Sequence, residues 1–480
     1  MTEADLLARI RRSGLDAGEL PTLDSRGELT PRVLAALVAR GDLTLPDGAL
    51  PAPKPAPMAA LAPLAAQLAD PPFVSPFPSV FMDMPGVPAA GSAAPAPKGL
   101  VVVPGALVPG FGPLFDDATA INWALGRAPA VFLLPVRYQL FSNIAMPSGA
   151  LLRGLRPVNQ SADSPAVYGT ILTITSGFAS TSGNISAAVT MDAGSGSLTN
   201  ITVEDLWVDG TSAPASVDGI TSFGQANAVT LSRVGVYKAT GNGVSQVKNG
   251  ALFADGWRID TANALNCGSS GFTGNWADAE LRNCHAQSNG SFGFFINGGN
   301  SRFTSCRADL GGSDGFRIDT PSGNQAGGFL DAVTLNACGS QRNQSYGCNI
   351  INGSATGTNT RAPVLMTGCS WDGDGVNGGA GGGTFAGVRV AGAVVLVAAE
   401  SSVLVHTEDV AAGCPNFAIR TDALGSGSGK PQLLRWDGGL LNAASATIIS
   451  DAAPAALRQV SSAGIASGQY TGASVLVAVS

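Results

Sequence analysis

The chain has 480 residues, of which 63 are glycine and only 13% are charged, and its formal net charge is −7 at pH 7. So much glycine and so little charge exclude an ordinary helix-rich α/β enzyme and are typical of a turn-rich β architecture. The sequence offers no basic stripe for phosphate backbones and no apolar run of about 18 residues, so we expect neither a nucleic-acid ligand nor membrane insertion.

Residues 1–49 are predicted to form a small helical module. One helix in it is expected to start with Thr30 as its N-cap and to stop at Gly41. The chain begins with acidic residues at Glu3 and Asp5, whereas a secretory signal begins with basic and then apolar residues. Export by the ordinary secretory route is therefore not expected.

Residues 50–98 are dense in proline and alanine, which predicts a semi-rigid linker. A large domain is expected over residues 99–430. Its opening contains a helix over 116–125, a strand over 131–134, Tyr138, Pro147-Ser148-Gly149 and Arg153-Gly154.

This order of segments resembles the opening of the pectate-lyase superfamily, in which an aspartate-led helix caps a right-handed parallel β-helix. The resemblance implies that the helix over 116–125 covers one end of such a solenoid. The match departs at Val136, where the family's turn usually carries a glycine, so this turn is expected to be built differently.

An internal repeat follows. A ladder residue stands three places after an apolar residue in each of six units, and in the first five units a glycine comes nine places later. The ladder residues are Val234, Ala262, Cys284, Cys306, Cys338 and Cys369, and the glycines are Gly243, Gly271, Gly293, Gly315 and Gly347. Steps of 28, 22, 22 and 32 residues between those glycines predict insertions in loops around a constant core.

The segments after the glycines alternate, as in Phe316-Arg317-Ile318 and Val388-Arg389-Val390, which predicts strands. Units of this length with several short strands predict an all-β fold, a right-handed single-stranded parallel β-helix. Stacked strands lie ~4.8 Å apart, so equivalent residues form columns. The cysteine column is either packing or a disulfide or metal framework. Sparse cysteines and the lack of a C-x-x-C pair favour packing.

A helical module and linker ahead of a β-helix resemble the layout of phage tailspikes and of fibres on phage-like gene-transfer particles. The resemblance implies a homotrimer on a virion, assembled in the host cytoplasm. Its N-terminal module would bind a particle protein, and its β-helix would recognise bacterial surface polysaccharide, either capsule or O-antigen. Residues 431–480 are expected to be terminal coils, or a C-terminal cap with trimer contacts.

Three functions stay open from the sequence. Polysaccharide binding alone is favoured, a depolymerase acting as hydrolase or lyase on the same scaffold is the main alternative, and a purely structural virion part is the third. A glycosidase needs two carboxylates, ~5.5 Å apart for retention and ~6.5–9.5 Å apart for inversion. The candidate catalytic residues are Glu280, Asp309 and Asp260, in the pairs Glu280 with Asp260 or Asp278, and Asp309 with Asp331.

Equivalent positions of successive units also carry candidate ligand-binding residues. They are Arg302, Arg307, His285, Asp314, Arg317, Asp319, Trp276 and Phe295. Arg258, Glu280 and Arg302 are equivalent, as are Asp260 and Arg282, and His285 and Arg307. Alternating charge along such a column either binds sugar or forms a surface salt-bridge ladder, and the ladder is favoured.

The other candidates each have a structural alternative. Trp276 and Phe295 offer rings on which sugars stack, or simply cover the core. Asp314 and Asp319 flank Gly315-Phe316, where aspartate beside glycine is also common turn chemistry. Asp372-Gly373-Asp374 lacks the later ligands of an EF-hand and is better explained as a glycine-rich loop. We therefore predict no metal and no cofactor.

Overall fold

The computed structural model describes the large domain and not residues 1–98, so the predicted helical module and linker lie outside the described residues. The described residues are 99–103, 106–110, 116–126, 129–133, 135, 137–155, 169–250, 254–320, 332–352, 363–375, 385–392, 394–405, 417–423, 433–443, 449–451, 457–463, 470–471 and 476–477.

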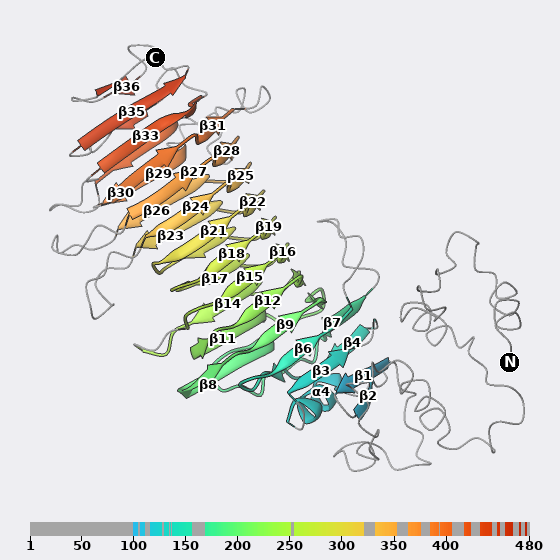
Figure 1. Cartoon of the computed structure of the whole chain (residues 1–480). Coiled ribbons are helices and arrows are strands. Elements are labelled where there is room, and N and C mark those ends of the chain that lie inside the picture. The colour runs from blue at the N-terminus through green and yellow to red at the C-terminus, as the bar shows by residue number, and fades with distance from the viewer. Residues whose placement is uncertain are drawn as a thin grey trace, which may run out of the picture.

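The domain is a solenoid in which three sheets run along its length, and most coils contribute one strand to each sheet (Figure 1). Sheet A is 15-stranded and parallel from β3 onward, whereas β1 pairs antiparallel with both β2 and β3. Its strands, in spatial order, are β2 (Ala106–Gly110), β1 (Gly99–Val103), β3 (Ala130–Leu133), β6 (Leu151–Arg153), β9 (Thr202–Glu204), β12 (Thr230–Ser232), β15 (Arg258–Asp260), β18 (Glu280–Arg282), β21 (Ser301–Thr304), β24 (Val333–Asn336), β27 (Pro363–Thr367), β30 (Val395–Ala399), β33 (Leu433–Leu440), β35 (Leu457–Ala463) and β37 (Leu476–Val477).

Sheets B and C are parallel throughout. Sheet B is 10-stranded and contains β4 (Arg137–Leu140), β7 (Thr170–Ile174), β10 (Leu206–Asp209), β13 (Gly235–Tyr237), β16 (Asn263–Leu265), β19 (His285–Gln287), β22 (Arg307–Asp309), β25 (Gly339–Gln341), β28 (Ser370–Asp372) and β31 (Ser402–Leu404). Sheet C is 12-stranded and contains β5 (Ile144–Ala145), β8 (Ala187–Thr199), β11 (Asp218–Asn227), β14 (Val244–Val247), β17 (Phe272–Gly274), β20 (Phe294–Ile296), β23 (Phe316–Thr320), β26 (Cys348–Asn352), β29 (Ala386–Gly392), β32 (Phe417–Asp422), β34 (Ile449–Asp451) and β36 (Tyr470–Thr471).

The predicted right-handed parallel β-helix is confirmed. The turn from sheet A to sheet B is the most regular feature of its coils, because it needs a single residue with positive φ. That residue is Arg233, Thr261, Asn283, Ser305, Ala337, Gly368 or Glu400 in successive coils. The variable residues of the repeat fall mostly between sheets C and A, as between β23 and β24. The predicted insertions therefore lie at this connection.

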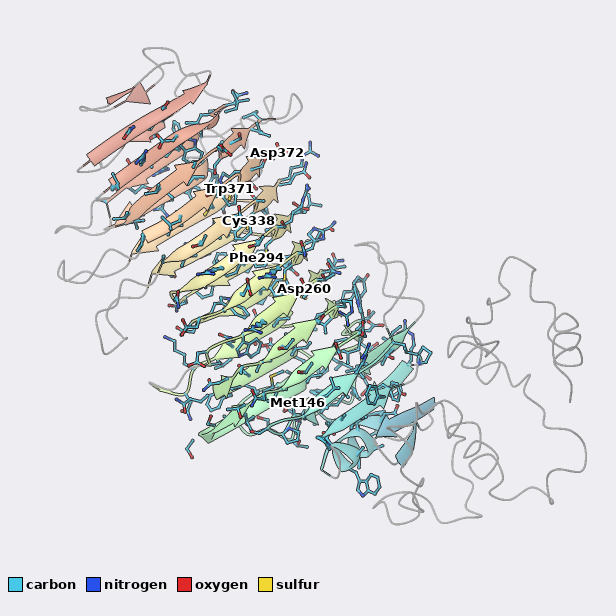
Figure 2. All side chains as sticks on the ribbon, in the orientation of Figure 1. Met146, Asp260, Phe294, Cys338, Trp371 and Asp372 are labelled. Carbon is cyan, nitrogen blue, oxygen red and sulfur yellow. The ribbon has the colours of Figure 1, made fainter. Side chains whose placement is uncertain are left out.

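The ladder residues and the apolar strand positions form the core. Cys338 and Phe294, both labelled in Figure 2, are at most 2% exposed. The six described cysteines are buried and free, and the Cys338 thiol donates to the Phe303 carbonyl of the preceding coil at 3.3 Å. Packing is therefore the role of this column. A Cβ on Gly293 would lie 2.6 Å from the Gly315 carbonyl of the next coil, so close stacking explains the repeated glycine.

Helix α4 (Asp117–Leu125) confirms the predicted helix at the N-terminal end. Asp116 caps it by accepting a bond from the Ala118 N–H at 3.1 Å, and it also accepts from the Phe141 N–H at 2.9 Å. No helix among the described residues is long and apolar enough to cross a membrane. At the other end, strands β33 to β37 continue sheets A and C within residues 433–477.

Candidate functional site

The predicted site residues lie on all three sheets rather than on one. Asp260, Glu280 and Arg302 belong to sheet A, and His285, Arg307 and Asp309 belong to sheet B. Phe295, Arg317 and Asp319 belong to sheet C, with Asp314 just before β23. Because each sheet forms a different side of the solenoid, the structure does not gather the three candidate catalytic carboxylates at one place. Asp331, the other half of one proposed pair, lies outside the described residues.

On sheet A the predicted register is found, since Glu280 pairs with Arg258 on one side and Arg302 on the other. The ion pair of Glu280, however, is with Arg282 of its own strand, whose Nε donates to Glu280 Oε1 at 2.9 Å. Side chains two apart on a strand share one face, so this contact forms without help from the neighbouring coils. Glu280 is thus held as half of a surface ion pair.

On sheet B, Asp309 joins two side chains. His285 Nε2 lies 3.0 Å from Asp309 Oδ2, and Arg307 Nε donates to the same oxygen at 2.6 Å. Arg307 also donates through Nη2 to Gln341 Oε1 at 2.7 Å. The predicted neighbours therefore meet in a network across three coils, in which Asp309 is the shared acceptor.

Trp276 does not offer a ring to a ligand. It is fully buried, its Nε1 donates to the Phe295 carbonyl at 3.0 Å, and its ring stands edge-on to Trp257 with centroids 6.0 Å apart. Of the two interpretations of Trp276, its burial favours the one in which the ring covers the core, because its place in the corner between coils turns the indole inward.

Sheet C carries a column of arginine side chains on its outer surface. Its strands β20, β23, β26, β29 and β32 place one outward residue each in strict register, over roughly 19 Å at ~4.8 Å per strand. We call this the arginine column, and it consists of Phe295, Arg317, Asn349, Arg389 and Arg420.

Aspartates fix the arginines of the column through their Nε atoms. Arg317 donates to Asp319 at 2.5 Å, whereas Arg389 and Arg420 donate to the same carboxylate, Asp422, at 2.6 and 2.9 Å. The three arginine side chains are only 20–23% exposed. Their guanidinium groups are therefore positioned before any ligand arrives.

Asp314 is a buried carboxylate that contacts two residues of the column. It is 2% exposed, accepts from Asn349 Nδ2 at 2.8 Å, and lies 3.6 Å from Arg317 Nη1. Burial raises the pKa of Asp314, and its hydrogen bonds to Asn349 and the Tyr346 N–H act in the opposite direction. Asp218 makes the matching bonds four coils earlier, to the Asn242 N–H and the Ser245 hydroxyl. Asp314 therefore joins neighbouring coils and also contacts an arginine of the column.

Two aromatic pairs accompany the column. Phe292 and Phe295 have ring centroids 5.4 Å apart, and Tyr346 and Phe385 have centroids 5.3 Å apart. The guanidinium of Arg317 lies 5.9 Å from the Phe292 ring, and that of Arg389 lies 5.3 Å from the Tyr346 ring. Cationic groups beside aromatic rings are suited to sugars, which offer both hydroxyls and apolar faces.

Sequence reasoning found only the start of this site. It named Phe295, Arg317, Asp314 and Asp319, and missed Tyr346, Asn349, Phe385, Arg389, Arg420 and Asp422. The signal was present, because Asn349 stands two places after the repeat glycine Gly347, as Arg317 does after Gly315, and Arg389 stands two places after Gly387. Aligning that outward position across the coils would have revealed the column.

The described residues contain no cluster of histidine, cysteine, aspartate or glutamate arranged to hold a metal ion. Asp374, in the loop compared above with a calcium site, is fully buried. It accepts bonds from the Ser340 hydroxyl at 2.5 Å and from Asn343 Nδ2 at 2.8 Å. Asp374 therefore joins neighbouring coils within the protein.

No protein-family model matches the sequence, and a search of the curated proteins finds no similar one. Solved structures are similar in fold. A tailspike protein mutant of E. coli bacteriophage HK620 in complex with a pentasaccharide is 8% identical with a TM-score of 0.53, covering 74% of this chain and 64% of that one.

Two other solved structures are similar in fold. The Dettilon tailspike protein is 11% identical with a TM-score of 0.52, covering 76% of this chain and 66% of that one. The A-module of the Azotobacter vinelandii mannuronan C-5 epimerase AlgE6 is 16% identical with a TM-score of 0.50, covering 73% of this chain and 96% of that one. The chain thus has the right-handed parallel β-helix fold that these structures share.

Proposed function

We propose that this protein is a spike or fibre of a phage or phage-like particle that binds bacterial surface polysaccharide. The arginine column is the observation that carries the proposal. It presents guanidinium groups fixed by carboxylates beside two aromatic pairs, along the axis of the solenoid. A polymer chain lying along the axis would meet a similar contact at each coil.

The assembly belongs to the same proposal. The protein acts as a homotrimer, in which repetition of weak sugar contacts raises the overall affinity. The segment 1–49 attaches it to a virion protein, with 50–98 as linker, and the particle is assembled in the host cytoplasm. Neither nucleic acid nor membrane insertion has a part in this function. The fold shared with tailspikes supports it.

Cleavage of the bound polymer is a second candidate, favoured by one observation. Arg317 contacts two carboxyl groups, Asp319 at 2.5 Å and Asp314 at 3.6 Å, so both lie within the span of one guanidinium. Burial raises the pKa of Asp314, while Asp319 is one-third exposed. Two carboxyl groups in unlike environments are what an acid and base pair requires.

Cell binding and polymer length distinguish these functions. The full chain is incubated with candidate host cells, with and without purified surface polysaccharide as competitor, and polymer length is read by size-exclusion chromatography. Competed binding with intact polymer supports a binder. A depolymerase is identified if the wild-type protein shortens the polymer and the Asp319→Asn variant leaves it at full length. A failure to bind cells or polymer refutes both and points to a structural virion part.

A further inference from the structure

We infer that the arginine column selects polysaccharides whose sugars carry carboxylate groups, and that Arg389 is the residue that binds the carboxylate. The inference rests on the proposed function and names the substrate class of the same site. It follows from three features of Arg389 and its neighbours: how the guanidinium is held, which of its donors are left, and which acceptor lies beside it.

Arg389 is held on two sides. Its Nε donates to Asp422 Oδ2 at 2.6 Å, and its guanidinium carbon lies 5.3 Å from the centre of the Tyr346 ring. Tyr346 is itself 8% exposed and packs edge-on against Phe385. The side chain therefore loses little conformational freedom when a ligand binds, which favours affinity.

The outer edge of the same guanidinium is unused. Within the described part of the chain, Nη1 and Nη2 of Arg389 take part in no hydrogen bond or ion pair. Two parallel N–H donors match the two oxygens of a carboxylate, and charge-assisted bonds of this kind are about twice as strong as neutral ones. A neutral sugar hydroxyl offers a single acceptor and no charge, so it uses this edge less well.

Asn349 adds an acceptor in the neighbouring coil. It pairs in register with Arg389, is 2% exposed, and donates a hydrogen bond from its Nδ2 to Asp314. Its Oδ1 is buried without a hydrogen-bond partner. A fully deprotonated inorganic anion such as sulfate has only acceptors to offer, whereas an acidic sugar carries hydroxyl donors next to its carboxylate. The two adjacent groups together favour an acidic sugar.

The test compares each polymer with its own uncharged form. A panel of uronate-containing bacterial capsular polysaccharides is immobilised, native or with the carboxyl groups chemically reduced to primary alcohols, and binding of the full chain is measured by biolayer interferometry. We expect the reduced polymers to bind at least about tenfold more weakly, as the loss of a charge-assisted bond predicts. Equal binding of native and reduced polymers would overturn the inference and leave the proposed function standing. No binding to either form would count against the proposed function as well.

Variants assign the effect to one residue. Arg389→Gln should lose most of the preference for native polymer, and Arg389→Lys should keep only part of it, because lysine presents no planar fork. Arg435→Gln is the matched control, since Arg435 is half-exposed, pairs with Asp437, and lies on sheet A. Thermal melting of each variant checks folding. A folded Arg389→Gln protein with the preference intact would overturn the assignment.

Discussion

At the scale of single residues, Asp374 shows how burial ties stability to pH. It is 0% exposed and bonded to Ser340 and Asn343, and burial raises its pKa from an ordinary 3.8 to about 7. Between these two values the folded state binds more protons than the unfolded state. The contribution of Asp374 to the free energy of unfolding is therefore fully present below about pH 4 and is lost as the pH rises through about 7.

We predict that Asp374→Asn removes this dependence. An amide keeps the acceptor for Asn343 and supplies a donor for the Ser340 hydroxyl, and it carries no charge to bury. The wild type should lose up to about 1.4 kcal/mol of unfolding free energy per pH unit over this window relative to the variant. Melting curves at pH 5 and pH 8 measure it, with Glu400→Gln on the surface as control. A variant that is less stable than the wild type at pH 8 would contradict the assignment.

At the scale of elements, the strands of sheet C are held by a stack of phenylalanines inside the coil. The Phe294 ring lies between those of Phe272 and Phe316, with centroids 4.9 and 4.6 Å away and nearly parallel planes. The next residue, Phe295, points outward and is only partly buried. Two consecutive residues of one strand thus place one phenylalanine in the core and the other on the outer surface.

We predict that Phe294→Ala lowers the free energy of unfolding by about 3–5 kcal/mol, because it leaves a cavity in the stack. Phe295→Ala should cost clearly less stability and instead weaken polysaccharide binding. Chemical denaturation and polymer binding of the two variants give the comparison. Equal stability losses would mean that the outer ring is part of the packing rather than of the binding surface.

The cysteine column makes a chemical prediction. Cys306 and Cys338 are buried on neighbouring coils, and burial raises the pKa of both thiols well above 9.0. Since the thiolate is the reactive form, these groups should not react with a thiol reagent in the native protein and should react on unfolding. A Cys414→Ala variant isolates the described cysteines for this assay. Rapid labelling under native conditions would show that the coils open readily.

The sequence was most informative where one side of a strand faces the core. Ladder positions such as Cys284 admit few side-chain types, so their repetition predicted coil, register and packing. Outward positions are under no such constraint, and there the predictions were less complete. Trp276 could not be placed, because its inward direction depends on a corner whose backbone has positive φ. The sequence could not predict that Glu280 bonds to Arg282 rather than to Arg258. Arg282 lies two places away on the same strand and Arg258 lies opposite on the neighbouring strand, so both are within reach of the carboxylate.

At the scale of the whole molecule, the proposal of a homotrimer has a direct consequence. Three copies of a solenoid that makes weak contacts at each coil bind a polymer with higher avidity than one copy does. Sedimentation equilibrium of the full chain should therefore give three times the chain mass of 48.1 kDa. A chain that stays monomeric at micromolar concentration would refute the trimer. A single solenoid would then have to attach to the host without the avidity of a trimer.

Polysaccharide is proposed to bind along the arginine column of sheet C. The most direct measurement is a crystal structure of the protein with an oligosaccharide released from a polymer that it binds. We predict a sugar chain parallel to the solenoid axis, with a carboxylate on Arg389 and a ring beside Phe295 or Tyr346. An oligosaccharide bound instead at the Asp309 network of sheet B, or beside Glu280 on sheet A, would contradict it.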